Sequence, residues 1–409
     1  MKSFNIPDFY RSDFISKIKT ERKKSDPRKQ DFSPTEIRLK GLTLILARHF
    51  GFCYGVENAI ERAYAALREN PGKRILLLSQ MIHNPAVNAD LQENGIDFIM
   101  DTEGNQLIAW DEVSHNDVVL IPAFGTTIEI EQLLISKGID IQTYNTTCPF
   151  VEKVWNRSEK LSTDRYTIII HGKPNHEETR ATFSHASSNG PAVVVKNMKE
   201  AELLADFMRG KRPIEEFLPL FGKQVSASFD PKTDLNRVGV VNQTTMLASE
   251  TQAIADFFKS VMEELHGKTE VKHHFADTRD TLCYATNDNQ QATFELLKSA
   301  PDLAIVVGGY NSSNTSHIVD LLAEACPTYF VKDENEMVSA GEIQHFNYHS
   351  KTLLRTNDWL ALNKPLRVVI TSGASCPDAV LQAVMFRLMS FYPDIDRQEL
   401  DRWIAEKFQ

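Results

Sequence analysis

Short apolar runs alternate with longer amphipathic stretches along most of this chain. The apolar runs are rich in Val, Ile and Leu and have the length of strands that are covered on both faces. They span residues 42–47, 75–78, 118–121, 166–170, 238–241, 303–307 and 366–370. The amphipathic stretches between them include residues 56–67, 200–208, 250–265 and 318–325. Strands that alternate with helices predict an α/β fold with mostly parallel sheets.

The rhythm of this pattern predicts three α/β domains with flanking segments. We place the domains at residues 42–147, 148–281 and 282–391. An excursion at 209–234, rich in Gly and Pro, interrupts the second domain. Residues 1–41 carry a basic cluster without a clear buried face and predict a solvated, partly helical extension. Residues 392–409 predict a charged helical tail.

The ends of the predicted strands carry a threefold pattern. Each unit begins with a cysteine that lies after a strand or turn and before a helix. These are Cys53, Cys148 and Cys283. Each unit continues with a polar cluster, at 83–84, 176–178 and 311–314, and closes with a turn rich in hydroxyl groups, at 124–127, 242–245 and 372–375. Because the carboxyl ends of parallel strands line the ligand crevice, we expect these clusters to converge on one site.

The three cysteines indicate a metal centre. A thiolate is favoured at a helix N-terminus, and the thiolate is the form that binds metal. Three thiolates suit an iron–sulfur cubane with one open iron, or a zinc site with an open position. A buried apolar thiol remains the alternative for any one of them. Cys326 and Cys376 lie outside the repeated position, and we expect them to be buried structural residues.

Composition narrows the function classes. The 409 residues are 42% hydrophobic and 24% charged, which allows a full core, and the formal charge of −10 argues against broad nucleic-acid binding. The five scattered cysteines do not suggest a disulfide framework. No apolar run has the length of a membrane span and no secretory signal is recognisable, so we expect a cytoplasmic protein. Without a glycine-rich nucleotide motif, electrons would come from another protein.

The polar clusters suggest roles for individual side chains. Imidazoles, hydroxyls and amides beside helix N-termini can bind an anion without Lys or Arg. The candidates are His83, His176, Ser312, Asn314 and Ser375. Glu178 is the carboxyl group that we expect inside the pocket as a proton donor, because a dry site would raise its pKa. Glu177 is interpreted as a solvated or helix-start neighbour. The hydroxyl of Thr244 is able to relay a proton or orient a substrate hydroxyl, and the alternative is that Thr244 is a turn or cap residue.

The motifs that carry these residues resemble the 4-hydroxy-3-methylbut-2-enyl diphosphate reductase family, from about residue 42 to about 387. They occur in the family's order: GFCYGVENAI, HNPAVN, TTCPFVEKVW, HEETRAT, NQTTM, TLCYATNDNQQA, NSSNTS and SGASCPD. The resemblance implies three α/β domains in a pseudo-threefold, trefoil-like arrangement around a central 4Fe–4S cluster. Cys53, Cys148 and Cys283 would be its three ligands, with one iron open to the substrate.

The resemblance also implies roles and a reaction. His83, His176, Ser312, Asn314 and Ser375 would hold the diphosphate with help from Ser313, Glu178 would deliver protons, and Thr244 would act on the substrate hydroxyl. The reaction would remove the allylic hydroxyl and give isopentenyl and dimethylallyl diphosphates, in the last step of the methylerythritol phosphate route to isoprenoids. Ferredoxin or flavodoxin would supply the electrons.

One position departs from the commonest bacterial pattern, and two other functions stay open. Phe124 stands where those family members have a histidine, as in the plant and cyanobacterial type. We expect Phe124 to pack against the pocket wall while the remaining donors bind the substrate. The alternatives are an iron–sulfur dehydratase similar to quinolinate synthase, and a protein without enzymatic activity that uses the three cysteines to bind zinc.

Overall fold

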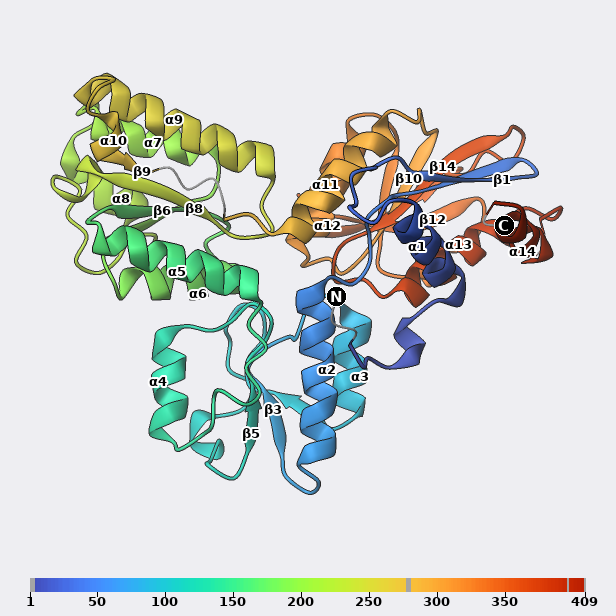
Figure 1. Ribbon diagram of the computed structural model, residues 1–409, viewed down its shortest axis with the longest axis horizontal. Helices are drawn as coiled ribbons and strands as arrows, with labels where there is room; N and C mark the ends of the chain where they lie inside the picture. The colour runs from blue at the N-terminus through green and yellow to red at the C-terminus, as the bar shows by residue number, and fades with distance from the viewer. Residues whose placement is uncertain (1–3, 277–280, 396, 408–409) are drawn as a thin grey trace. The chain divides into compact units, whose positions relative to one another are not determined.

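The computed structural model describes residues 4–276, 281–395 and 397–407. The chain forms two compact units (Figure 1). Unit 1 joins Met1–Glu57, His83–Asn88 and Tyr284–Gln409, and unit 2 joins Asn58–Ile82 and Ala89–Cys283. Across the described ranges, no helix has both the length and the apolar character needed to cross a bilayer.

Unit 1 is built on a five-stranded sheet in the order β1-β2-β14-β10-β11. The strands are β1 (Thr35–Leu39), β2 (Leu42–Leu46), β10 (Leu303–Val307), β11 (Thr328–Val331) and β14 (Leu366–Ser372). Only the β1–β2 pair is antiparallel. Every residue of β10 is buried, as expected for a central parallel strand with both faces covered.

Helices and a hairpin complete unit 1. The helices are α1 (Asp13–Ser25), α11 (Tyr284–Leu297), α12 (Ser313–Ala323), α13 (Asp378–Met389) and α14 (Arg397–Lys407), and the hairpin joins β12 (Glu342–Asn347) and β13 (Thr352–Asn357). Two further helices, α2 (Tyr54–Glu69) and α3 (Pro85–Glu93), begin in unit 1 and continue into unit 2. Helix α14 agrees with the predicted tail; residues 408–409 lie outside the described part.

The basic N-terminal segment differs from the solvated extension that we predicted. Helix α1 begins at an N-cap, where Ser12 Oγ accepts a hydrogen bond from the Ile15 amide, and it buries Phe14, Ile15 and Ile18. These side chains belong to the same core as the strands of the main sheet. The apolar stripe is only three residues wide among many lysines, which is why the pattern was read as solvated. The helix itself was predicted; its burial was not.

Unit 2 contains two smaller parallel sheets. A three-stranded sheet has the order β4-β3-β5, and a four-stranded sheet has the order β7-β6-β8-β9. The strands are β3 (Ile75–Leu77), β4 (Ile96–Phe98), β5 (Val118–Leu120), β6 (Thr167–His171), β7 (Ala192–Val195), β8 (Val238–Asn242) and β9 (Phe275–Ala276). The helices that belong wholly to unit 2 are α4 (Ile128–Ser136), α5 (Pro149–Thr163), α6 (Glu177–Ser187), α7 (Met198–Met208), α8 (Phe217–Phe221), α9 (Ala248–His266) and α10 (Val271–His274).

The predicted α/β class with mostly parallel sheets is confirmed. The excursion at 209–234 is folded: it contains α8 and places Phe217, Phe221 and Phe229 in the core around β6 and β8. Strand β2 pairs with β14 of unit 1, whereas we had grouped it with the strands at 75–78 and 118–121. Parallel pairing joins strands distant in sequence, so order along the chain could not assign β2 to its sheet. The predicted domain boundaries stay a prediction.

Candidate functional site

The predicted site residues occur in two groups, one in each unit. Unit 1 contains Cys53, His83, Ser312, Ser313, Asn314 and Ser375, and unit 2 contains Cys148, His176, Glu178, Thr244 and Cys283. In both groups the residues follow the carboxyl ends of parallel strands or precede helices, as the pattern predicted.

The N-terminus of α12 presents polar groups that are buried and unused. Ser312 is the N-cap: its Oγ accepts a hydrogen bond from the Thr315 amide at 3.2 Å and one from Thr315 Oγ1 at 2.8 Å. Ser313 and Asn314 follow, and their side chains are 2% and 4% exposed. Ser313 Oγ and Asn314 Nδ2 make no hydrogen bond with any described residue. Because such groups are costly to bury alone, this helix end is suited to an anion.

The oxygen of the Asn314 amide is fixed by its neighbours. Asn314 Oδ1 accepts from the Ala374 amide at 3.1 Å and from Asn289 Nδ2 at 3.3 Å. With the oxygen engaged, the amide nitrogen is the part of the side chain left to bind a ligand. Sequence reasoning did not single out Asn289. Its position in the polar run after Cys283 was the available signal.

His83 and Ser375 lie next to this helix end. Ser375 Oγ donates to the His83 carbonyl at 3.1 Å, and both residues are buried. A Cβ atom at Gly309 would lie 2.2 Å from the same carbonyl oxygen, so only glycine permits this approach of two backbones. The loop of His83 is therefore held against the loop that leads into α12. Unit 1 brings together five of the six candidates for anion binding: His83, Ser312, Ser313, Asn314 and Ser375.

The three cysteines have similar local settings. Cys53 and Cys283 directly precede α2 and α11, and Cys148 is the N-cap of α5. The Cys53 amide donates to the Ala374 carbonyl at 3.2 Å, and the Cys148 amide donates to the Ala123 carbonyl at 3.0 Å. All five cysteines of the chain are described, and all are thiols. A thiol at a helix N-terminus is suited to metal ligation.

Among the described residues, the side chains that could bind a metal do not form a cluster. Within residues 4–276, 281–395 and 397–407, no three side chains of Cys, His, Asp and Glu lie close enough together to hold a metal ion. Shared ligation by the three cysteines therefore stays a prediction. The other two cysteines are buried, as expected, and burial raises the pKa of the Cys376 thiol to about 12.

Glu178 is a buried carboxyl group at the start of α6. Its side chain is 1% exposed, and the Thr244 amide donates a hydrogen bond to Glu178 Oε1. Burial raises the pKa of Glu178 to about 7, although the hydrogen bonds from Thr244 act in the opposite direction. His176 is the N-cap of the same helix, and its Nδ1 accepts from the Glu178 amide at 3.2 Å. The sequence prediction of a protonated carboxyl group in a dry setting agrees with this geometry.

The neighbouring carboxyl group was misjudged. Glu177, interpreted from the sequence as a solvated or helix-start neighbour, does begin α6, but it is 7% exposed and accepts a hydrogen bond from Ser79 Oγ. Burial raises the pKa of Glu177 to about 7 as well. Ser79 follows β3, in the other sheet of unit 2. The sequence pattern around α6 therefore could not predict that Ser79 covers Glu177. Two adjacent carboxyl groups are therefore buried at this helix end.

Phe124 packs on His176. The two rings meet edge to face with their centroids 5.7 Å apart. The next residue, Gly125, has φ +75°, and a Cβ atom there would lie 2.4 Å from the Trp155 ring. The turn that carries Phe124 is therefore held close to α5. The expectation that Phe124 packs on the wall of the site fits this contact.

Comparisons with known proteins place the chain in a family. Residues 44–389 match the family described as LytB protein. A curated relative from Trichormus variabilis, named 4-hydroxy-3-methylbut-2-enyl diphosphate reductase, is 42% identical over 85% of both chains. A relative of the same name from Gloeobacter violaceus is 40% identical over 86% of this chain and 84% of its own.

Solved structures agree at the level of the fold. A reductase of (E)-4-hydroxy-3-methyl-but-2-enyl diphosphate aligns with a TM-score of 0.51 and 24% identity over 85% of this chain and 99% of its own. The E-1-hydroxy-2-methyl-but-2-enyl-4-diphosphate reductase from Plasmodium falciparum aligns with a TM-score of 0.61 and 20% identity over 90% of this chain and 99% of its own. These matches favour neither alternative function. The resemblance found in the motifs is confirmed, and the chain belongs to the LytB family.

Proposed function

We propose that this protein reduces (E)-4-hydroxy-3-methylbut-2-enyl diphosphate to isopentenyl and dimethylallyl diphosphates. Two electrons and two protons enter, and the allylic hydroxyl leaves as water. Membership of the LytB family and the names of relatives about 40% identical support this assignment. The structural observation that carries it is the pair of unused buried donors at the start of α12, Ser313 Oγ and Asn314 Nδ2, which suit a diphosphate.

The proposed cofactor is a 4Fe–4S cluster held by Cys53, Cys148 and Cys283. Their thiols and their positions just before helices fit this ligand set. When bound, the cluster would supply the electrons and one iron with an open position. The protein's own contribution is to bind the diphosphate, orient the hydroxyl and deliver protons.

The diphosphate is proposed to bind through neutral donors. Ser313 Oγ and Asn314 Nδ2 would donate to phosphate oxygens, together with the amides at the start of α12. His83, Ser312 and Ser375 line the same helix end in unit 1, and we propose His176 of unit 2 as a further donor. Because these groups are mostly buried, their hydrogen bonds to a charged ligand would be stronger than in water.

Glu178 is proposed to deliver the protons. With a pKa of about 7, a substantial fraction of Glu178 carries a proton at neutral pH. The proton would pass to the leaving hydroxyl, which departs as water. Thr244 adjoins Glu178 through its backbone amide, and its hydroxyl would orient the substrate hydroxyl. The diphosphate of the substrate would assist as a local base and acid.

The electrons are proposed to come from ferredoxin or flavodoxin, and the cytoplasm is our proposed location. The test is anaerobic purification followed by iron, labile sulfide and zinc analysis, with turnover measured in the presence and absence of a chemical reductant. We expect about four iron atoms and four sulfides per chain and product only when reductant is present. A cluster signal perturbed by the substrate would support direct coordination. Zinc without iron or sulfide, or turnover without reductant, would contradict the proposal.

A further inference from the structure

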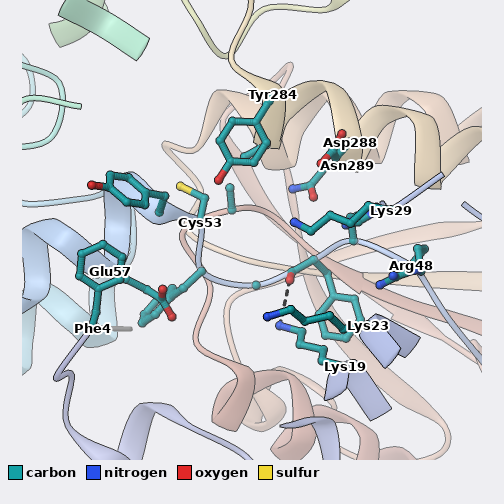
Figure 2. Close-up of a pocket in the computed structure, with 17 residues that line it drawn as sticks. Phe4, Lys19, Lys23, Lys29, Arg48, Cys53, Glu57, Tyr284, Asp288 and Asn289 are labelled. Carbon is teal, nitrogen blue, oxygen red and sulfur yellow. Dashed lines mark hydrogen bonds between the residues drawn. The ribbon is translucent and has the colours of Figure 1, made fainter. Parts of the chain in front are cut away.

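A pocket in unit 1 carries basic side chains that have no role in the proposed reaction. It has a volume of about 240 Å³ and lies beside Cys53 (Figure 2). Its wall is formed by α1 and the loop after it, by residues 48–54 with the start of α2, and by the first two turns of α11. Four cationic side chains line it: Lys19, Lys23, Lys29 and Arg48. Figure 2 shows Lys19, Lys23 and Lys29 on the side opposite Glu57 and Phe4.

Two of these cations, Lys19 and Arg48, are fixed by hydrogen bonds or by burial. Lys19 Nζ bonds Asp378 at 2.7 Å and the Phe50 carbonyl at 3.0 Å. Arg48 is 8% exposed, its nearest carboxylate oxygen is on Asp26 at 3.6 Å, and its Nε has no hydrogen-bond partner among the described residues. A buried guanidinium with incomplete pairing creates a positive potential in the pocket. Burial, together with repulsion from Arg48 and Lys29, lowers the pKa of His49 to about 4.

The other two cations are available to a partner. Lys23 is exposed and Lys29 is half-buried, and neither forms an ion pair with a carboxylate in the part of the chain that the structure describes. Lys29 Nζ lies 5.9 Å from the Tyr284 ring, and this ring is 39% exposed. The wall contains two carboxyl groups, Glu57 and Asp288, against four cationic side chains. The chain as a whole carries a formal charge of −10, so this patch is opposite in sign to the rest of the protein.

Aromatic rings extend this patch. Phe52 lines the pocket and meets Tyr10 at 5.7 Å, and Tyr10 meets Phe9 at 4.4 Å. Phe9 is 58% exposed. Exposed rings beside cations are typical of a protein interface, whereas a site for a small anion needs only the cations. The wall also contains the carboxyl groups of Glu57 and Asp288, and this mixture of charges favours a broad partner over a compact anion.

We propose that this pocket and its rim are the docking surface for an acidic electron-carrier protein. The inference rests on the proposed function, in which Cys53 is a cluster ligand and the electrons come from outside. A carrier whose carboxylates meet Lys23 and Lys29 would have its redox centre near Cys53, which lines the same pocket. Complementary charge also raises the rate of encounter, by about 10-fold to 10³-fold at low salt.

The test compares two double variants of the holoenzyme that change the net charge equally. Lys23→Glu with Lys29→Glu alters the pocket. Lys17→Glu with Lys24→Glu alters exposed positions of α1 that do not line it. The probe is a purified acidic ferredoxin, with its Kd measured by titration and its KM in turnover. We expect the pocket variant to raise both by about tenfold or more at low salt. The control variant should change them by less than about threefold, and high salt should remove the difference.

Reduced methyl viologen separates docking from chemistry. It is a small cation, so charge reversal at Lys23 and Lys29 does not repel it, and viologen-driven turnover should persist in the pocket variant. If the pocket variant lost turnover equally with viologen and with ferredoxin, the proposal would be overturned, because the lysines would then affect the cluster and not the docking of the carrier. Weaker binding of inorganic pyrophosphate with unchanged ferredoxin affinity would also overturn it and indicate a site for small anions. Absence of viologen-driven turnover in the wild type would instead contradict the proposed function.

Discussion

Helices α6 and α12 begin in nearly the same setting but present opposite chemistry. Each follows an interior strand that pairs in parallel with both neighbours, β6 between β7 and β8, and β10 between β11 and β14. Each strand is followed by a glycine, Gly172 or Gly308, where a Cβ atom would lie 2.7 Å from the hydroxyl of Thr179 or Thr315. The backbone framework of the two helix ends is therefore shared.

The residues of the first turn decide what each helix end can do. Helix α6 starts with Glu177 and Glu178, whose burial raises the pKa of both carboxyl groups to about 7. Helix α12 starts with Ser313 and Asn314, neutral side chains of which Ser313 Oγ and Asn314 Nδ2 make no hydrogen bond within the described part of the chain. A carboxyl group whose pKa is near 7 can give up a proton at neutral pH, whereas neutral donors at a helix N-terminus can bind an anion. In the proposed function, the same supersecondary unit would therefore serve proton transfer at α6 and anion binding at α12, according to two side chains.

The largest effect is expected at the start of α6, for the substitution Glu178→Gln. We expect kcat to fall by about 10² to 10⁴, because the amide fits the space but cannot supply a proton. KM should change little. Glu177→Gln is the matched control, one residue earlier on the same helix, and it should keep most of the turnover. Viologen-driven kinetics with cluster absorbance as a check on loading would measure both. Comparable losses in the two variants would remove the distinction between the carboxyl groups.

The same substitution tests the raised pKa through stability. The pKa of Glu178 in the folded protein, about 7, lies above the ordinary value of 4.5, so the folded state binds more protons between these pH values. This contribution to the free energy of unfolding is present below about pH 4.5 and is lost as the pH rises through 7. Wild type should therefore lose stability between pH 5 and 8, measured by urea unfolding. Glu178→Gln should lose less, and an equal loss would contradict the assignment.

The anion-binding end is tested by a pair of adjacent serines. Ser313→Ala should raise KM for the diphosphate by roughly tenfold to a hundredfold, since a hydrogen bond to a charged group is lost. Its thermal stability should be unchanged or higher, because Ser313 Oγ has no partner in the described residues. Ser312→Ala removes the N-cap of α12 and should cost about 1 kcal/mol of stability. If Ser313→Ala instead lowered the melting temperature and left KM unchanged, Ser313 would be structural.

The smallest expected effect is that of Phe124→His. The edge-to-face contact with His176 would be lost, at a cost of about 0.5–1.5 kcal/mol, and the new imidazole would add one polar group near α6. We expect KM to change by less than about threefold, because the donors of α12 are untouched. Steady-state kinetics and a melting curve measure this, with Phe150→His on α5 as a comparison. A large gain in substrate affinity would show that the site lacks a donor.

Several features could be predicted from local pattern because local physics decides them. The strands are buried runs of branched apolar residues, and their lengths agree with β6, β8, β10 and β14. The cysteines and polar clusters follow strands and precede helices, and this follows from turn and capping preferences. Buried Glu178 was also foreseen, since it follows β6 closely. Burial of Glu177 was not, because Ser79 covers it from a different sheet.

The sequence alone determined the α/β class, the family, and which side chains stand at strand ends, because each depends on residues near one another in the chain. Tertiary structure decided that β2 joins β14, that α1 contributes to the core, and that a basic pocket forms beside Cys53. These outcomes depend on contacts between segments hundreds of residues apart, such as Lys19 with Asp378. Such contacts are selected by packing and charge in the folded chain, and no periodicity along the sequence records them.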